Sequence, residues 1–387
     1  MSLQKIYLIL LFTYSLVSCN KFEKYCPKVQ LNEIGSLVDK NRVDSIQARV
    51  DLLVKNGFYD EAAKVDKLQD WYEFMNVYVE DTIAQKDIKL AAFSKSIKMI
   101  PKDNSILMIN EAHHLVEHRL MVLNNLKLWK SEGYKYIAIE AISNDLNIPI
   151  FKYGGVNPEI GFYTDEPYFS NILLLAKELG LELIRYEPLI AKYDVPGNRD
   201  SLMAINILKQ WKPENGKLLI YCGWAHIYNQ KYWLRSYLEK SNLSLKIFSI
   251  NQTYLNSSIG SKYQESLRKN LKNIDCPSIL IRNGELYRLG KGYEMELIYP
   301  ELPLKSDNCF PNLININELL KRLDKNVTYY FYNSEVDFDY LCEINPNLIV
   351  YNTSSNTDFY YLLPGKYNLF KYSTKNSSLN FIKSISL

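Results

Sequence analysis

The feature that most constrains the fold is an alternation of short apolar runs with amphipathic segments, which begins near residue 105 and continues to about residue 250. The apolar runs have the length of buried strands, and the segments between them have helical spacing. We expect strands at 106–109, 136–139, 183–186, 218–221 and 246–250, and helices at about 115–131, 168–179, 199–211 and 230–238. Such alternation is typical of a parallel sheet with crossover helices. It predicts an α/β domain with a central, mostly parallel sheet at residues 104–256.

The region that precedes this domain, residues 19–103, is expected to be helical. Apolar positions recur at helical spacing over 43–54 and 59–74, and Asn56-Gly57 separates the two stretches. The pair is similar to one repeat of the tetratricopeptide kind. Repeat folds need several copies, so we favour the alternative that these helices pack against the main domain.

The region that follows, residues 257–387, lacks the alternation. Short runs such as 278–281, 328–332 and 348–351 are bounded by Asn, Ser, Pro and Gly, which predicts a small β-rich C-terminal unit. Pro364-Gly365 is a turn signal, and it favours a hairpin of strands at 359–363 and 367–372.

The first residues have the pattern of an export signal. Lys5 precedes an apolar run at 6–17, and Ser18-Cys19 follows it. The segment from Leu16 to Cys19 resembles the lipobox of bacterial lipoproteins, in which the cysteine is acylated and becomes the first residue. We expect residues 1–18 to be a lipoprotein signal peptide and Cys19 to anchor the chain in the bacterial cell envelope, at the outer membrane or cell surface. An ordinary secretory signal is the alternative.

Charge and cysteine content exclude some classes of partner and site. The formal net charge is +3, from 46 basic and 43 acidic residues that are mixed along the chain, and no basic stripe is present. Nucleic acid is therefore not an expected partner. The cysteines beyond Cys19 are widely spaced, an odd set without a Cys-x-x-Cys pair. This spacing disfavours a disulfide framework or a thiolate zinc site, and it leaves a single bridge open.

The histidines are concentrated at the ends of expected strands. Of the four, His113, His114 and His118 fall within residues 110–119, after the first strand, and His226 follows the fourth strand. Ligands of open parallel sheets bind outside the carboxyl ends of the strands. The carboxylates that end the first, second and third strands should meet these histidines at one rim: Glu111, Glu140 and Glu187.

These residue types indicate a hydrolytic or metal-binding site. A helix that begins near His113 would place His114 and His118 on one face, and imidazole is a natural general base near neutral pH. Two imidazoles and a carboxylate are also a usual set of ligands for a divalent metal, here Glu111, His113 and His226. Arg119 is expected to bind an anionic group or to fix Glu140 or Glu187.

Two further segments are expected at the same rim. Arg199 would start a helix, where a cation is disfavoured, so we expect it to reach into the site. The alternative is that this segment only initiates the helix, with Asn198 or Asp200 accepting hydrogen bonds from the free backbone amides of its first turn. Residues 149–166, rich in Gly, Pro and Tyr, are too long for a simple connection and predict a functional loop or lid.

The segments together resemble a superfamily that includes erythromycin esterase-like proteins, haem-binding ChaN lipoproteins, and the TraB and Tiki proteases. The resemblance covers roughly residues 104–250. It rests on Glu111-x-His113, His118-Arg119, Glu140, Arg199-Asp200-x-x-Met203-Ala204, Gly223-x-x-His226, Gly161-Phe-Tyr163-Thr-Asp165-x-Pro167 and Tyr186-Glu187. Many members have Gly before the first Glu, where this chain has Asn110.

The resemblance implies a site more strongly than a reaction. Its members suggest ester hydrolysis with histidine as base, metal-dependent peptide hydrolysis, or haem capture. It implies that Tyr163, Asp165, Glu187 and Asp200 contact a small-molecule or peptide substrate. No Gly-x-Ser-x-Gly sequence is present, so water is the expected nucleophile. The leading hypothesis is an envelope hydrolase that uses the catalytic set Glu111, His113, His118, Arg119, Glu140, Arg199 and His226. The alternative is a surface protein that binds haem or another nutrient without catalysis.

Overall fold

The computed structural model describes residues 23–25, 43–66, 88–144, 147–188, 195, 197–253, 255, 271, 274–300, 309–352, 360–373, 375 and 378–387. The expected signal peptide and Cys19 lie outside these residues. Within them, no helix has the length and apolar content needed to cross a membrane.

The central sheet has the expected parallel core. Its strands run in the order β11-β10-β12-β9-β3-β8-β4-β7, with β2 paired to β10. The five expected strands are all present, as β3 (Ile106–Glu111), β4 (Tyr134–Ile139), β7 (Glu182–Ile184), β8 (Lys217–Gly223) and β9 (Ile247–Asn251), and each pairs in parallel with its neighbour. The prediction of an α/β fold is confirmed.

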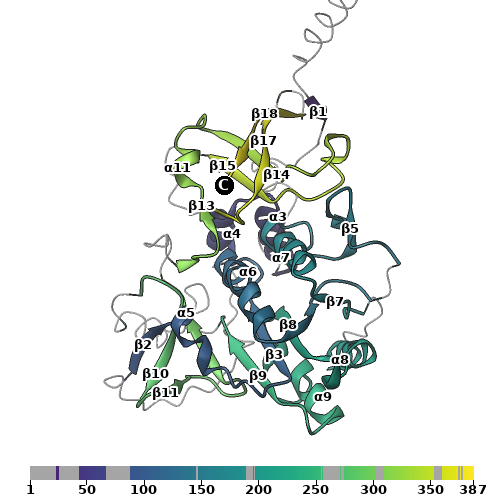
Figure 1. Cartoon of the computed structure of the whole chain (residues 1–387), viewed down its shortest axis with the longest axis vertical. Helices are drawn as coiled ribbons and strands as arrows, with labels where there is room; N and C mark the ends of the chain where they lie inside the picture. The colour runs from purple at the N-terminus through teal and green to yellow at the C-terminus, as the bar shows by residue number, and fades with distance from the viewer. Residues whose placement is uncertain are drawn as a thin grey trace, which may run out of the picture.

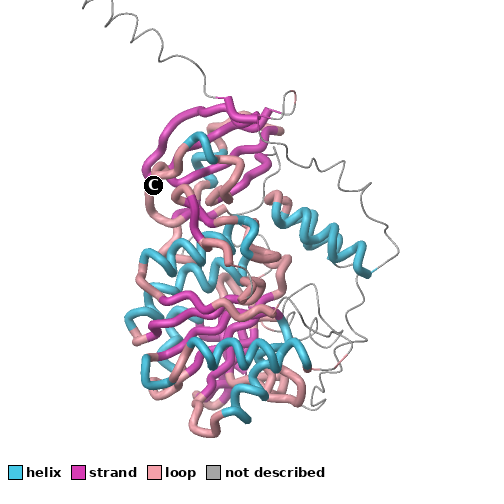
Figure 2. Tube along the Cα trace, turned by 90° about the vertical axis from the view of Figure 1, so that its right-hand side faces the viewer, coloured by secondary structure: helices cyan, strands magenta, loops and turns pink. Residues whose placement is uncertain are grey.

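Helices cover both faces of this sheet. The side chains of β3 alternate between two cores: Leu107 and Ile109 pack under α6 (Val116–Ser131) and α7 (Pro167–Glu178), while Ile106 and Met108 face α8 (Asn198–Gln210) and α9 (Leu234–Ser241). Each such buried aliphatic side chain contributes about 1.5–3 kcal/mol to folding. Figures 1 and 2 show the resulting layers, with the strands between the two sets of helices. Apolar runs without polar alternation are the consequence of burial on both faces.

The boundaries of the sheet differ from those expected. The hairpin strands β10 (Ser278–Arg282), β11 (Glu285–Tyr287) and β12 (Met295–Ile298) were assigned by pattern to the C-terminal unit, yet they extend the central sheet. Likewise β2 (Ile88–Ala92) is a strand in the region expected to be helical, followed by the short α5 (Phe93–Ser96). Local pattern encodes a strand but not the sheet that it joins, so strands that follow residue 257 in sequence can still belong to the central sheet.

The C-terminal unit is a separate antiparallel sheet in the order β1-β18-β17-β14-β15. Its strands are β1 (Glu23–Tyr25), β14 (Val327–Asn333), β15 (Leu348–Asn352), β17 (Lys366–Ser373) and β18 (Ser378–Ser386). The hairpin expected around Pro364-Gly365 does not form. Instead β16 (Tyr361–Leu362) pairs with β13 (Ile314–Asn315), and β17 pairs with β14 and β18. A turn signal reverses the chain but does not select the partner strand.

A helical hairpin of α3 (Val43–Lys55) and α4 (Tyr59–Asp66) packs into a core that also contains residues of both sheets. It breaks at Asn56-Gly57, as predicted, and Gly57 has a left-handed backbone with φ of 80°. A Cβ at Gly57 would lie 2.6 Å from the backbone oxygen of Ile349. The hairpin therefore contacts the C-terminal unit closely at a position where only glycine fits.

Disulfide bonds are more frequent than the cysteine spacing suggested. Cys276 and Cys309 form a bond, Cys342 is also disulfide-bonded, and Cys222 is a buried free thiol. The Cys276–Cys309 bond links the edge hairpin of the central sheet to the chain that leads into the C-terminal unit.

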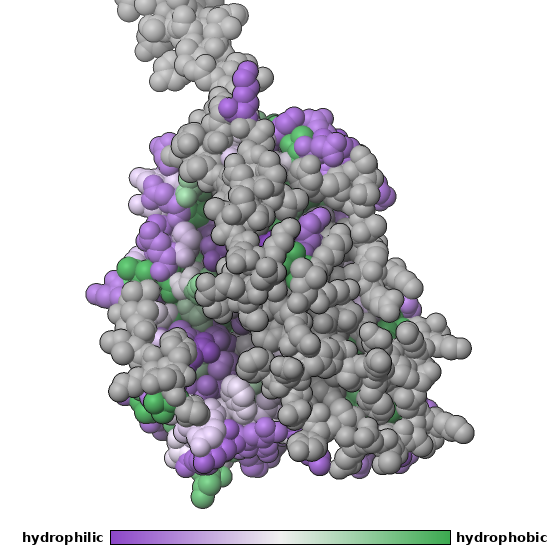
Figure 3. Space-filling view, turned by 180° about the vertical axis from the view of Figure 1, so that it is seen from behind, coloured by the Kyte–Doolittle hydropathy of each residue, from purple (hydrophilic) through white to green (hydrophobic). Residues whose placement is uncertain are grey.

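On the face seen in Figure 3, most coloured residues are hydrophilic, and hydrophobic residues form small separate patches.

One polar contact joins α7 to the C-terminal sheet. Asn171 donates to the carbonyl of Asn347, and the Asn347 side chain donates to Asn171 Oδ1, both at 2.8 Å in a buried setting. Figure 1 shows α7 between the two sheets. We expect Asn171→Ala to lower the free energy of unfolding by about 1–3 kcal/mol, because it leaves buried groups of Asn347 unpaired.

Urea denaturation of the purified domain measures this loss. Asn215→Ala, which changes an exposed asparagine, is the matched control and should stay within about 0.5 kcal/mol of the parent. Equal effects of the two variants would contradict the structural role of the Asn171–Asn347 pair.

Candidate functional site

The carboxyl ends of β3, β4, β7 and β8 bring the expected residues together. Glu111 ends β3 in register with Gly223, which ends β8. The backbone amide of Glu140 donates to the carbonyl of Tyr221, and Glu187 follows β7. Parallel strands end at one edge of a sheet, so residues far apart in number meet there. We call this set of side chains the rim cluster: Glu111, His113, Glu140, Glu187, Arg199, Asp200 and His226.

Glu111 and His113 form a dyad at the start of the rim cluster. The Glu111 Oε1 atom lies 2.7 Å from His113 Nδ1. Glu111 is 1% exposed, whereas 19% of the His113 side chain is exposed. A carboxylate on Nδ1 fixes the ring orientation and places the other nitrogen, Nε2, toward the rim.

A buried arginine holds the other side of Glu111. Arg119 donates from Nε to Glu111 Oε2 at 2.9 Å and from Nη2 to Oε1 at 3.1 Å, and Tyr221 donates its hydroxyl to the same carboxylate. Burial raises the pKa of Glu111, but Arg119 and His113 outweigh burial and hold it well below its ordinary value. Glu111 is therefore a carboxylate with every oxygen occupied.

The same guanidinium reaches a second carboxylate. Arg119 Nη1 lies 2.9 Å from Glu166 Oε2, and Tyr59 donates to Glu166 Oε1 at 2.7 Å. Glu166 also accepts from the amide of Phe169 and so begins α7. Arg119 was expected to bind an anionic or carboxylate group, or to fix Glu140 or Glu187; the structure pairs it with the carboxylates of Glu111 and Glu166. Glu166 precedes a proline at the start of a predicted helix, which is the one sequence signal that could have identified it.

Arg199 joins the other carboxylates of the rim cluster. It donates to both oxygens of Glu187, at 2.6 and 2.7 Å, and to Glu140 Oε1 at 2.6 Å. The amide of Gly223 donates to Glu140 as well. Burial raises the pKa of Glu140, but His226 and then Arg199 outweigh it and hold it well below its ordinary value. The expectation that Arg199 reaches from the helix start into the site agrees with this geometry.

His226 lies within η6 (Trp224–Ile227) and is 6% exposed. Its Nδ1 lies 2.5 Å from Asp200 Oδ1, and its Nε2 lies 3.5 Å from Glu140 Oε1. Burial lowers the pKa of His226, but Glu140 and Asp200 outweigh burial and raise it to about 10. Arg199 Nη1 also lies 3.1 Å from His226 Nε2. This contact would be a hydrogen bond only if the His226 ring were neutral, because a protonated Nε2 cannot accept. Because carboxylates face both nitrogens, we take the ring to be a cation.

Gly223 is the point at which the two halves of the rim cluster meet. A Cβ at this position would lie 2.9 Å from His113 Nε2 and 3.0 Å from Glu140 Oε2. Both side chains therefore approach the backbone closely, and a larger residue would displace one of them. His113 and His226 accordingly lie on the same side of the sheet, each near Glu140.

The chain after Glu140 turns sharply to carry the long loop over the rim cluster. Ala141 has a φ of 70°, a left-handed conformation that costs about 1–3 kcal/mol at strained sites. Ile142 then bridges to Gly161, and Ser143 bridges to Glu187. These bridges bring the segment 161–166 back to the rim.

Tyr163 on this segment stacks on the dyad. The rings of Tyr163 and His113 have centroids 3.9 Å apart and an interplanar angle of 18°. Phe162, which is 58% exposed, packs edge-on against Tyr163. Asp165 pairs instead with Lys55 at 3.2 Å, on the side of α3. Of the residues that the resemblance assigns to substrate, Glu187 and Asp200 belong to the rim cluster and Tyr163 stacks on it.

The structure does not bring His114 and His118 to the exposed rim. The Nδ1 atom of His118 accepts from the amide of Ala112 at 2.9 Å, and its ring packs against Tyr299. Burial lowers the pKa of His118 to about 3, which a hydrogen bond to the backbone of Gln252 opposes. Burial and then His113 lower the pKa of His114 to about 3. The helix begins at Val116, close to the expected residue 115 and not near His113, so His114 precedes it and His118 lies in its first turn and points into the core.

Most carboxylate oxygens of the rim cluster already accept hydrogen bonds within the protein. Both oxygens of Glu111 and of Glu140 accept hydrogen bonds, and Asp200 holds His226 Nδ1. In the described part of the chain, no three His, Cys, Asp or Glu residues are arranged to hold a metal ion. The metal set expected from the sequence, Glu111, His113 and His226, stays a prediction.

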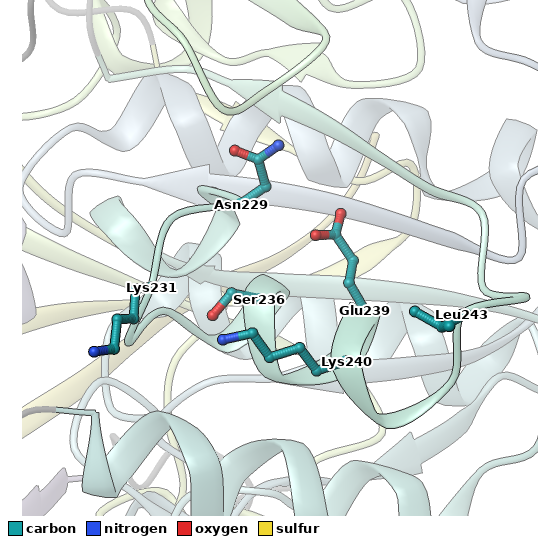
Figure 4. A pocket seen from close by; sticks show the side chains of 6 residues that line it. All are labelled: Asn229, Lys231, Ser236, Glu239, Lys240 and Leu243. Atoms are coloured by element: carbon teal, nitrogen blue, oxygen red, sulfur yellow. The ribbon is translucent and has the colours of Figure 1, made fainter.

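A separate surface pocket of about 320 Å³ lies at α9. Figure 4 shows the residues that line it: Asn229, Lys231, Ser236, Glu239, Lys240 and Leu243. Glu239 pairs with Arg235 at 2.7 Å. None of the lining residues belongs to the rim cluster.

The comparisons with known proteins assign no family. No family model matches the sequence, and no curated protein matches it. The type III effector HopBA1 is one solved structure that this chain matches, at 11% sequence identity and a TM-score of 0.32. The match covers 58% of this chain and 96% of that chain. A likeness this low carries no argument about function.

We expect Arg119→Leu to lower the free energy of unfolding by about 3–5 kcal/mol at neutral pH, because it leaves Glu111 and Glu166 buried without a cation. The pKa of Glu111 is held below its ordinary 4.5. The stability that it contributes is present above pH 4.5 and is lost as the pH falls below that value. The difference between variant and parent should therefore shrink in acid.

Arg235→Leu is the control for this experiment. Arg235 is also buried, but its partners Glu239 and Glu294 are 35% and 29% exposed and can be hydrated when it is removed. In guanidinium denaturation at several pH values, Arg235→Leu should lower the free energy of unfolding clearly less than Arg119→Leu does, and this decrease should depend little on pH in the acid range. Equal losses for Arg119→Leu and Arg235→Leu would contradict the buried ion-pair assignment.

Three of the histidines, His114, His118 and His226, should titrate far from the ordinary pKa of 6.5 in an NMR experiment. His226 should stay protonated to about pH 10, and His114 and His118 should stay neutral down to about pH 3. Because the pKa of His226 is raised from 6.5, its contribution to stability is complete below pH 6.5 and is lost as the pH rises through 10. Asp200→Asn should lower this pKa, and a His226 signal that titrates near its ordinary value in the parent would rule out the cationic ring.

Proposed function

We propose that the rim cluster is the active site of a hydrolase that cleaves an ester or peptide bond with an activated water molecule. The observation that carries this proposal is the Glu111–His113 dyad, with Oε1 and Nδ1 2.7 Å apart. A histidine held through Nδ1 by a carboxylate, with Nε2 directed to a partly exposed rim, has the arrangement of a general base.

The chemistry requires only groups that the cluster holds. His113 Nε2 takes a proton from water while the water oxygen attacks the substrate carbonyl carbon. The protonated ring then donates that proton to the leaving alcohol or amine, and a carboxylic acid is the second product. Glu111 stabilises the imidazolium that forms between the two steps, and Arg119 and Tyr221 keep Glu111 ionised and fixed.

The second half of the cluster contains two cations, Arg199 and His226, which three carboxylates hold in place. Arg199 and the cationic His226 lie beside Glu140, next to the backbone position that His113 approaches. Positive groups fixed in a site before the reaction can stabilise the oxygen that becomes negative in the tetrahedral intermediate. We assign this role to the Arg199–His226 pair, and Glu140, Glu187 and Asp200 hold it in place.

The steps above are written with the side chains of this chain alone. Metal dependence, which the resemblance implies for some members, is tested by metal analysis of the purified protein. Haem binding remains the alternative function. His113 Nε2 is the imidazole nitrogen of the rim cluster best placed to ligate iron, so haem addition to the parent and to His113→Asn gives a direct comparison of Soret spectra.

We also propose that the chain is a lipoprotein of the bacterial cell envelope, anchored through Cys19. The support is the signal pattern of residues 1–19 together with the disulfide bonds at Cys276–Cys309 and Cys342, which are typical of an oxidising compartment. The hydrolase activity would then act on a small molecule or peptide outside the cytoplasm.

The hydrolase proposal predicts a loss of about 100-fold or more in kcat for His113→Asn, because a general base contributes typically ~10²–10⁴-fold. The soluble form without the signal peptide is tested on a panel of chromogenic esters and fluorogenic peptides. Glu111→Gln should also lose activity, since it no longer favours the imidazolium. Asn215→Ala is the control and should keep full activity. A folded His113→Asn protein that hydrolyses as fast as the parent would refute the assignment.

A further inference from the structure

The loop segment 161–166, which carries Tyr163, makes three sets of contacts with the rest of the protein. These contacts determine where the Tyr163 ring lies relative to His113 of the Glu111–His113 dyad. The Tyr163 ring stacks on His113 with centroids 3.9 Å apart. The hydrogen bond to Glu111 fixes the position of His113 Nδ1, and a ring stacked on the imidazole also fixes the plane of the ring. Tyr163 is therefore a second contact that holds the ring in its orientation.

The α3–α4 hairpin holds one side of the segment. Lys55 Nζ lies 3.2 Å from Asp165 Oδ1 and 4.8 Å from the centroid of the Phe162 ring. Tyr59 donates to Glu166 at 2.7 Å. The residues on both sides of Tyr163 are thus bound by a hairpin that lies outside the α/β domain in sequence.

The C-terminal unit holds the opposite side. Asn345 donates to the carbonyl of Thr164, the residue after Tyr163, and to Ser170 Oγ at 2.9 Å. The rings of Tyr340 and Tyr153 stack with centroids 3.6 Å apart, so the start of the same loop is also attached to this unit. Thr164 closes the segment on itself by donating to the carbonyl of Gly161 at 2.8 Å.

The third contact comes from the interior. Glu166 pairs with Arg119, and Arg119 pairs with Glu111, which binds His113. The segment therefore meets the dyad twice, through the stacked ring of Tyr163 and through this chain of buried charges. A shift of the segment would change both contacts together.

We propose that Tyr163 is a positioning residue for His113, and that the α3–α4 hairpin and the C-terminal unit act as a clamp that sets the place of its ring. The proposal rests on the proposed function for its kinetic consequence, but its structural content concerns only the orientation of His113. It gives both regions outside the α/β domain a common role, which is to fix the catalytic base.

NMR of histidine-labelled protein tests the clamp without any substrate. Tyr163 should shift the His113 ring signals through its ring current, and His113→Gln identifies those signals among the four histidines. Tyr163→Leu should abolish the shift, and Tyr163→Phe should keep it. Tyr59→Phe and Asn345→Ala, which each remove one contact of the clamp, should reduce the shift partly.

Asn380→Ala is the control within the C-terminal unit, because the Asn380 side chain donates locally to Ser378. It should leave the His113 signals unchanged. Unchanged His113 signals in Tyr163→Leu would overturn the stacking. Signals in Tyr59→Phe and Asn345→Ala that match those of Asn380→Ala, in folded protein, would overturn the clamp.

Kinetics with a hydrolysed substrate give the second measurement. Tyr163→Leu should lower kcat by about 10- to 100-fold with little change in KM, because misplacing a catalytic group by about 1 Å can cost about 100-fold. Tyr163→Phe should recover most of the activity. A change in KM alone would overturn the positioning role and assign Tyr163 to substrate binding. If the parent hydrolyses nothing while the NMR shifts behave as expected, the proposed function fails and the clamp stands.

Discussion

The buried guanidinium of Arg119 is the group on which the rest of the site depends. It is 1% exposed and lies between Glu111 and Glu166, two carboxylates that are equally buried. A buried charge is tolerated only when it is paired and its hydrogen-bonding groups are used. This requirement fixes α6 against α7, because Arg119 belongs to the first helix and Glu166 begins the second. It also fixes Glu111, and through Glu111 the ring of His113.

The rim cluster contains a second arginine with a different environment. Arg199 has a side chain that is 25% exposed, and its partners Glu140 and Glu187 lie nearer the surface than those of Arg119. Arg119 and its carboxylates thus form buried ion pairs in the core, whereas Arg199 and its carboxylates form ion pairs at the partly exposed edge of the sheet. His113 and His226 lie between these two arginines, one with a carboxylate on a single nitrogen and the other facing carboxylates at both. The two rings therefore suit different tasks, proton transfer and charge stabilisation.

The three regions of the chain share one continuous core. Residues of the α3–α4 hairpin, of α6 and α7, and of the C-terminal sheet pack in the same cluster, which includes Leu53, Leu123, Ile172 and Phe331. The buried amides of Asn171, Asn345 and Asn347 are paired across the junction. Unpaired amides in this position would be costly, so their pairing makes the junction specific. The C-terminal sheet is consequently part of the support for the loop of Tyr163.

The sequence by itself determined the strands of the parallel core, the helices between them and the gathering of Glu111, His113, Glu140, Glu187 and His226 at one edge. It could do so because apolar periodicity reports burial, and because parallel strands place their carboxyl ends together. Only the tertiary structure decided that β2 and β10–β12 join this sheet, that Arg119 pairs with Glu166, and that His118 turns into the core while His113 faces the rim. Pairing between strands and between charges is set by contacts distant in sequence, and no local pattern contains them.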